Sequence, residues 1–117
     1  MNKKRRARRE RETTIKVGAK IERENLKEQE EFINDKIMNA EFDENYSGIG
    51  IKSKLEGMCI GTEAHVFIDK EELKIRLKNS RTNETTIFSI NDVYYIDGLF
   101  NEEEGHQPKM LWKNQEI

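Results

Sequence analysis

The chain has 117 residues, of which 38% are charged and 34% are hydrophobic. This length allows one small domain, and the low hydrophobic content indicates that part of the chain adds little to any core. A single cysteine and two histidines exclude an internal disulfide and leave little material for a metal centre.

The net charge of −2 hides a division along the chain. Residues 1–20 hold nine basic and two acidic residues, whereas the remainder holds twelve basic and twenty-one acidic ones. This asymmetry is typical of a basic arm on an acidic body. No apolar stretch follows the basic start, and no run approaches the roughly 20 apolar residues of a membrane span. We therefore expect a soluble protein of the host-cell cytoplasm with no membrane contact. Abundant isoleucine, asparagine and lysine favour a bacterial or phage origin.

The first predicted segment is a basic arm over residues 1–18. Like charges four residues apart repel each other in a helix, so the isolated arm is expected to be disordered. Phosphates would neutralise this repulsion, and arginine can bind a phosphate or a guanine edge through two hydrogen bonds. The expected nucleic-acid contacts in the arm are Lys3, Lys4, Arg5, Arg6, Arg8, Arg9, Arg11 and Lys16.

The stretch "RRARRERE" over residues 5–12 resembles the arginine-rich RNA-binding peptides that begin phage antitermination proteins. Peptides of that family fold as a helix on an RNA hairpin, so the resemblance implies contact with RNA. It covers about a dozen residues and stops at Ile15. Three alternatives remain open: pairing with the acidic helix that follows, pairing with a partner protein, and an idle tail.

The second predicted segment is a helix over residues 19–44, which contains no proline and no glycine. Its charge is acidic, with nine acids and three bases over residues 22–44. A helical period places Leu26, Ile33, Ile37 and Ala40 in one narrow stripe. Such a stripe either packs on another part of the chain or pairs two copies as a homodimer through Leu26, Ile33 and Ile37.

The third predicted segment is a small antiparallel β-sheet or barrel of about five strands over residues 46–98, which makes the fold class α+β. The clearest strand is "LKIRLK", with Leu73, Ile75 and Leu77 on one face. Its other face presents Lys74, Arg76 and Lys78 as a second candidate nucleic-acid contact. Cations on alternate strand residues are about 6.6 Å apart, close to the spacing of phosphates along an extended single strand. Lysine on a solvent-facing strand is also common without any ligand.

Residues 99–117 are expected to form a tail that packs on the sheet. Among the aromatic residues, Phe67 and Phe88 are assigned to the core, whereas the adjacent Tyr94 and Tyr95 face opposite ways in a strand. Cys59 lies among apolar residues, which favours a buried, inert thiol. No catalytic residue, metal site or cofactor site is expected, and the glycines fit no phosphate-binding loop.

These features predict a non-catalytic binding protein whose arginine-rich arm contacts nucleic acid or a nucleoprotein complex. The alternative is an inhibitor that acts through protein–protein contacts. The build of a compact β-domain with a charged arm resembles that of small phage-encoded inhibitors of bacterial defence nucleases, including anti-CRISPR proteins. That resemblance implies a host nuclease as partner. The choices between RNA and DNA and between single and double strands remain open.

Overall fold

The computed structural model describes residues 15–115, with side chains described from Asn25 onward. One long helix, α2 (Ile15–Glu41), precedes seven strands and a short 3₁₀ helix, η1 (Ile90–Asp92). The strands are β1 (Tyr46–Ser53), β2 (Gly57–Gly61), β3 (Glu63–Asp69), β4 (Glu72–Asn79), β5 (Glu84–Ser89), β6 (Val93–Glu102) and β7 (Gly105–Lys113). The predicted α+β class is confirmed.

The structure has seven strands where the sequence predicted about five, and the two additional strands are β2 and β7. β2 has five residues and is bounded by glycines, so its sequence carries little strand signal. β7 contains Pro108, which a strand at the edge of a sheet tolerates because one side of its backbone has no neighbouring strand. Residues 99–113, which we expected in a tail, instead extend β6 and form β7.

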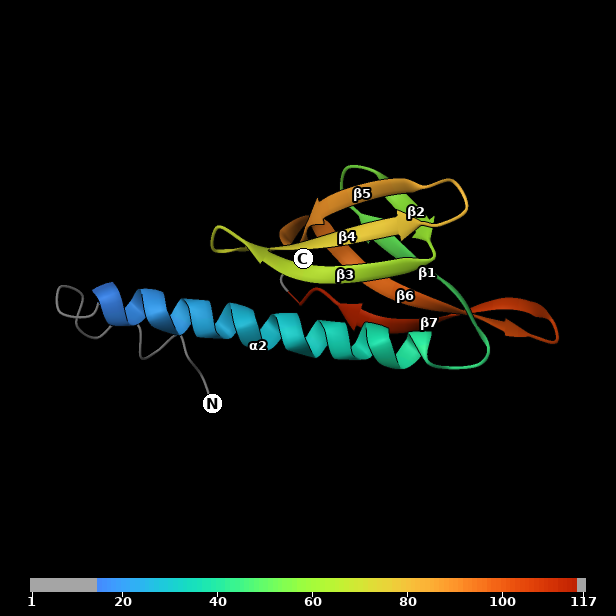
Figure 1. The fold of residues 1–117 in the computed structure, drawn as a ribbon, viewed down its shortest axis with the longest axis horizontal. Helices are drawn as coiled ribbons and strands as arrows, with labels where there is room; N and C mark the ends of the chain where they lie inside the picture. Colours follow the sequence, from blue (N-terminus) through green and yellow to red (C-terminus); the bar gives the residue numbers. More distant parts are fainter. Residues whose placement is uncertain (1–14, 116–117) are drawn as a thin grey trace.

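The strands form two antiparallel sheets, with the orders β2-β1-β6-β7 and β3-β4-β5 (Figure 1). The chain enters the second sheet at a corner between Gly61 and Glu63 and returns to the first through η1. A Cβ atom at Gly61 would lie 2.7 Å from both the Leu77 Cδ1 atom and the Lys78 carbonyl oxygen. The corner therefore requires glycine, because any side chain would collide with β4.

The hydrophobic core lies between the two sheets and follows the alternation predicted for β4. Leu73, Ile75 and Leu77 are all buried, whereas the alternate residues of β4 face outward. The opposite sheet contributes buried side chains of β1 and β6, including Ile51 and Ile96. β4 is the central strand of its sheet, so its outward lysines do not serve to protect an open edge.

Helix α2 lies along β3 and also contacts β7, which are edge strands of the two sheets (Figure 1). Ile33 and Ile37 are 1% and 2% exposed and belong to the core, with Leu26 packed against it. Of the two uses considered for the apolar stripe, packing within the same chain is the one observed. Ile33 and Ile37 are thus unavailable to a second copy in this structure.

The helix begins and ends earlier than the predicted range of 19–44. It includes Gly18, where we expected the arm to end; an interior glycine costs a helix about 1 kcal/mol relative to alanine. It ends at Glu41 because the next residues form a turn. The Asp43 side chain accepts a hydrogen bond from the Asn45 backbone N–H at 2.8 Å, and the Asp43 carbonyl accepts one from the Tyr46 N–H at 3.0 Å.

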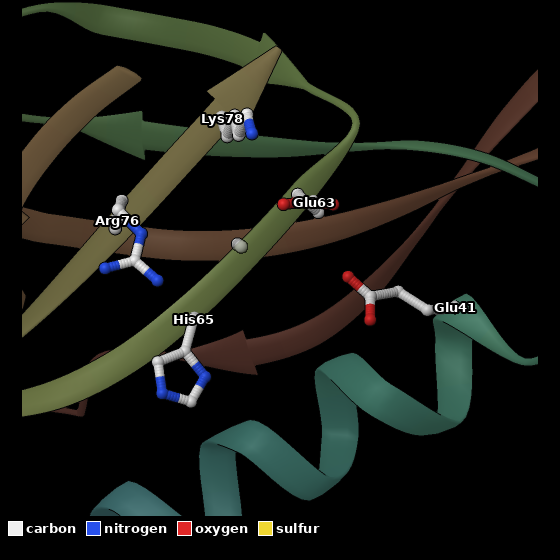
Figure 2. Close-up of a pocket in the computed structure, with 6 residues that line it drawn as sticks. Glu41, Glu63, His65, Arg76 and Lys78 are labelled. Atoms are coloured by element: carbon white, nitrogen blue, oxygen red, sulfur yellow. The ribbon is translucent and has the colours of Figure 1, made fainter. Parts of the chain in front are cut away.

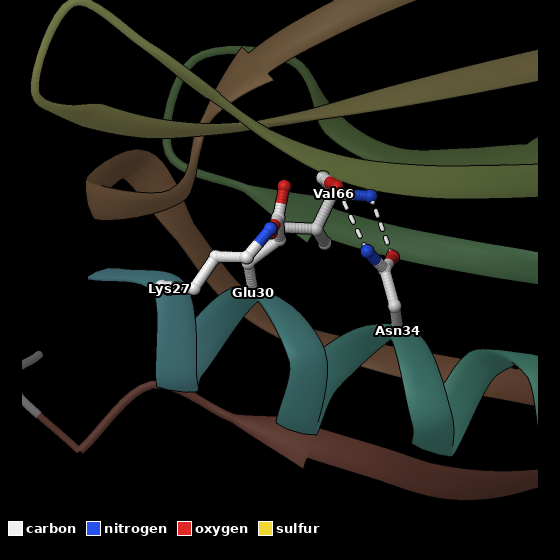
Figure 3. A network of polar contacts seen from close by, with 4 residues as sticks. All are labelled: Lys27, Glu30, Asn34 and Val66. Carbon is white, nitrogen blue, oxygen red and sulfur yellow. Dashed lines mark hydrogen bonds and ion pairs between the residues drawn. The ribbon is translucent and has the colours of Figure 1, made fainter. Parts of the chain in front are cut away.

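Asn34 joins the helix to the open edge of β3 (Figure 3). Its side-chain amide donates a 2.8 Å hydrogen bond to the Val66 carbonyl, and its side-chain oxygen accepts one of 2.8 Å from the Val66 N–H. The amide thereby bonds Val66 in the way a neighbouring strand would. One side chain both orients α2 and satisfies two backbone groups of an edge strand.

We expect Asn34→Ala to lower the free energy of unfolding by about 1–3 kcal/mol, because two hydrogen bonds to a partly buried backbone are lost. The matched control is Asn39→Ala, an exposed position on the same helix with the same gain in helix propensity. Urea unfolding followed by circular dichroism measures both variants. Equal stability of the two variants would show that the Asn34 contact adds nothing.

Candidate nucleic-acid interface

The predicted contacts fall into two groups, of which the structure describes one. The arm residues Lys3, Lys4, Arg5, Arg6, Arg8, Arg9 and Arg11 lie outside the described residues. Lys16 lies in the first turn of α2, but its side chain is outside the described part. The geometry of the interface is therefore built from the strand residues.

The three cations of β4 occupy one face, as the alternation predicted. Arg76 is exposed, and Lys74 and Lys78 are partly exposed, while the residues between them are buried. The backbone of β4 is held in place at Lys78, whose carbonyl accepts the Thr62 N–H at 2.8 Å and the Thr62 hydroxyl at 3.1 Å. The row of cations therefore stands on a central strand that is hydrogen-bonded on both sides.

The strand register brings two ring-bearing residues of β3 beside this row. Phe67 pairs with Lys74, and His65 pairs with Arg76, so these side chains share the outer face of the sheet. The Arg76 guanidinium lies 5.9 Å from the centroid of the Phe67 ring, within cation–π range. We call the outer surface formed by His65, Phe67, Lys74, Arg76 and Lys78 the basic face.

The assignment of Phe67 to the core was wrong, whereas that of Phe88 is confirmed at 5% exposure. Phe67 stands between Val66, which is buried, and Ile68, which packs against the core. It therefore points outward. The stretch "AHVFID" is apolar enough to hide this alternation, because a large aromatic residue occupies an outward position. The sequence signal that finds Phe67 is the two-residue period counted from Val66.

Arg76 and Lys78 make no ion pair within the described part of the chain, whereas Lys74 does. The Lys74 ammonium group lies 2.9 Å from the Asp69 carboxylate. This hydrogen bond, together with the opposite charges, raises the pKa of Lys74 and lowers that of Asp69. A ligand phosphate would have to compete with Asp69 for Lys74, so Arg76 and Lys78 are the more available cations.

A hollow of about 310 Å³ lies where the C-terminal end of α2 meets the basic face (Figure 2). Its lining combines both signs of charge: Glu41, Glu63, Ala64, His65, Arg76 and Lys78. Glu41 comes from the end of the helix, and its carboxylate is directed toward β3. The remaining residues lie on β3 and β4. We call this cavity the charged hollow.

Within the hollow, Glu41 has a carboxylate that is partly shielded from solvent. Its Oε2 atom is shielded from solvent and has no hydrogen-bond partner among the described residues. Burial raises the pKa of Glu41, an effect that the Ala64 backbone N–H partly offsets and that the charge of Glu63 reinforces. No sequence pattern marks this acid, because its setting depends on where the helix ends against β3.

A serine–histidine pair elsewhere has the wrong hydrogen bonding for nucleophilic activation. The Ser47 hydroxyl lies 2.9 Å from His106 Nδ1 and donates to the Leu99 carbonyl at 3.0 Å. When the hydroxyl donates to the Leu99 carbonyl, His106 Nδ1 is the donor to Ser47, an arrangement in which the histidine does not act as a base. This pair instead links the start of β1 to the β6–β7 hairpin.

Cys59 and the paired tyrosines add little to the interface. Cys59 is partly buried against the core, and this burial raises the pKa of its thiol, which keeps the reactive thiolate scarce. Tyr94 is 40% exposed and Tyr95 is half-buried, so neither is a fully buried core residue. Both belong to β6, in the other sheet from the basic face.

No family model matches the chain, and comparisons with curated proteins and with solved structures found no match. The function must therefore be inferred from the residues and geometry of the chain itself. Over residues 15–115, no helix is both long enough and apolar enough to cross a membrane.

We expect Glu41→Gln to make the folded state more stable than wild type at pH 7. A raised folded-state pKa means that folding favours the protonated acid, so wild-type stability falls as pH rises above the ordinary value of 4.5 through the raised one. The difference between the two proteins should shrink toward pH 4. Urea midpoints at pH 4 and pH 7 measure it, with the exposed Glu31→Gln on the same helix as control. An equal difference at both pH values would contradict the prediction.

Proposed function

We propose that this protein is a non-catalytic binding protein that contacts nucleic acid, alone or in a nucleoprotein complex. The contacts come from the arginine-rich segment 3–16 and from the basic face. The observation that carries the proposal is the alternation on β4, where Lys74, Arg76 and Lys78 all face outward beside the Phe67 ring. A rigid row of cations beside a partly exposed aromatic ring suits single-stranded nucleic acid.

The cations and the aromatic ring of this surface contribute different interactions. Lysine and arginine bind phosphates irrespective of sequence and release counterions. An aromatic ring supplies a platform on which a base can stack, worth about 1–3 kcal/mol per base. Phe67 is already in contact with Arg76, so a stacked base would extend an existing cation–π arrangement.

The acidic remainder of the chain restricts where phosphates can bind. Residues 21–117 hold twelve basic and twenty-one acidic residues. Most of the surface therefore repels a polyanion, and the basic segments are the places where a strand can approach. The single-strand preference follows from the Phe67 ring beside the cations, on which an unpaired base can stack.

Binding to short single strands should decrease steeply with salt. Contact with about five phosphates predicts a log–log slope of about −3.5. Deleting residues 2–16 should remove most of this slope, and the double variant Arg76→Gln/Lys78→Gln should reduce it by about 1.4, since two phosphate contacts are lost. Fluorescence anisotropy over a salt series measures each slope.

The matched control is Lys109→Gln/Lys113→Gln, which removes two exposed charges from β7 in the other sheet. It changes the net charge equally but leaves the basic face intact. Equal effects of the two double variants would show that the basic face makes no specific contact. Absence of any binding by the full-length protein at low salt would overturn the proposed function.

A second candidate function, inhibition of a host nuclease through protein contacts, is favoured by exposed apolar side chains on α2 and at Phe42, the residue that follows it. Phe42 is 80% exposed, and Phe32 and Met38 are about half exposed, among acidic neighbours. Exposed aromatic side chains and methionine are typical of protein interfaces.

This alternative predicts that Phe32→Ser/Phe42→Ser abolishes capture of a nuclease from a bacterial lysate pretreated with DNase and RNase. Leu55→Ser, which removes a largely exposed apolar side chain from the connection between β1 and β2, serves as the control and should leave capture unchanged. Quantitative mass spectrometry of the captured proteins measures the loss. Loss of all partners after DNase and RNase treatment alone would count against direct protein contact.

A further inference from the structure

The charged hollow places two carboxylates beside Arg76 and Lys78 of the basic face. Phosphate binding gives no role to Glu41 and Glu63, because both would repel the backbone of a nucleic acid. Both acids line the same cavity as Arg76 and Lys78. A ligand that fits this cavity must therefore offer negative charge at one end and hydrogen-bond donors at the other.

Glu41 identifies what the ligand would supply at the acidic end. Its Oε2 atom is shielded from solvent but receives no hydrogen bond from the described residues. A shielded carboxylate oxygen without a donor is costly, and rotation of the carboxylate toward a ligand N–H group in the hollow would remove that cost. The raised pKa of Glu41 has the same cause, since burial disfavours its charged form.

Arg76 and Lys78 define the other end. Neither makes an ion pair within residues 15–115, and both stand on the central strand of the sheet. Across the strands Glu63 pairs with Lys78, and His65 pairs with Arg76 and is exposed. Its ring offers a surface on which a base can stack, as histidine does in proteins that bind single-stranded RNA.

We propose that the charged hollow binds one nucleotide of a single strand, with its phosphate at Arg76 and Lys78 and the exocyclic amino group of its base at Glu41. This proposal rests on the proposed function and deepens it by assigning base selectivity to the same surface. The volume of about 310 Å³ lies near the lower end of the range for ligand pockets, roughly 300–1,000 Å³. It suits one nucleotide.

The carboxylate of Glu41 distinguishes the bases by their amino groups. Adenine, cytosine and guanine each carry an exocyclic NH₂ group that can donate to the Glu41 carboxylate. Uracil and thymine carry carbonyl oxygens at the corresponding positions. They can donate only through the ring N3–H, which lies between two carbonyl oxygens whose lone pairs would face the carboxylate. The hollow is therefore selective for adenine, cytosine or guanine over uracil and thymine.

The test compares anisotropy of full-length protein on labelled octamers of A, C and U in RNA and of A, C and T in DNA. The A and C octamers should bind about tenfold more tightly than the U and T octamers, the effect of one hydrogen bond to a charged group. Octamers of G are omitted because they associate with one another. Paired RNA and DNA octamers show whether the sugar contributes.

Glu41→Gln should reduce this ratio to about onefold to threefold, because a neutral amide can donate to the carbonyl oxygens of uracil and thymine as well as accept from an amino group. The matched control Glu31→Gln carries the same change on an exposed part of α2 and should keep the wild-type ratio. A thermal melt of each variant confirms folding. The ratio of affinities for the A and C octamers over the U and T octamers is measured on the wild-type protein, so this part of the test does not depend on whether a variant folds.

The outcomes separate this inference from the proposed function. Binding that depends on residues 2–16 but is equal for all octamers overturns base selectivity and leaves the proposed function in place. A preference that persists unchanged in Glu41→Gln overturns the role of Glu41. Failure of the full-length protein to bind any octamer at low salt overturns the proposed function and this inference together.

Discussion

The open edge of β3 is the constraint on which the rest of this structure depends. An unpaired strand edge exposes backbone groups that water or another chain would otherwise bind. Here α2 lies along that edge, and the Asn34 amide makes both hydrogen bonds of a missing neighbouring strand with Val66. The same helix inserts Ile33 and Ile37 into the core, and these contacts determine where its last turn lies. Glu41, in that last turn, therefore lies beside the outer face of β3.

That placement gives one face of a small domain two opposed kinds of charge. Cations on β4 are solvent-facing because their neighbours Leu73 and Ile75 are buried, whereas Glu41 is partly desolvated because the helix ends against the sheet. Burial raises the pKa of this carboxylate, so we expect its charged form to weaken folding at neutral pH relative to a neutral amide. A residue that costs stability at a surface hollow is typical of a binding site, where a ligand satisfies what the free protein leaves unsatisfied.

The sequence predicted the parts of this surface that depend on local periodicity. The two-residue alternation of β4 placed Lys74, Arg76 and Lys78 outward, and the helical stripe identified Ile33 and Ile37 as the buried side of α2. The sequence did not reveal β7, whose Pro108 and polar residues resemble a tail. It also did not reveal the charged hollow, because Glu41 and Arg76 are 35 positions apart and meet only through the packing of α2 on β3 and the register of β3 with β4.

The two proposed contacts, at residues 3–16 and at the charged hollow, would contribute different interactions to binding. Attraction between arginine-rich residues 3–16 and phosphates acts at long range and is insensitive to sequence, so it raises the local concentration of any single strand. A cavity for one nucleotide acts only at contact and distinguishes bases by whether they donate to a carboxylate. The acidic body makes this division effective, since it repels strands that are not held at the basic face. Affinity from one end of the chain and selectivity from a rigid sheet would then combine in a protein of 117 residues.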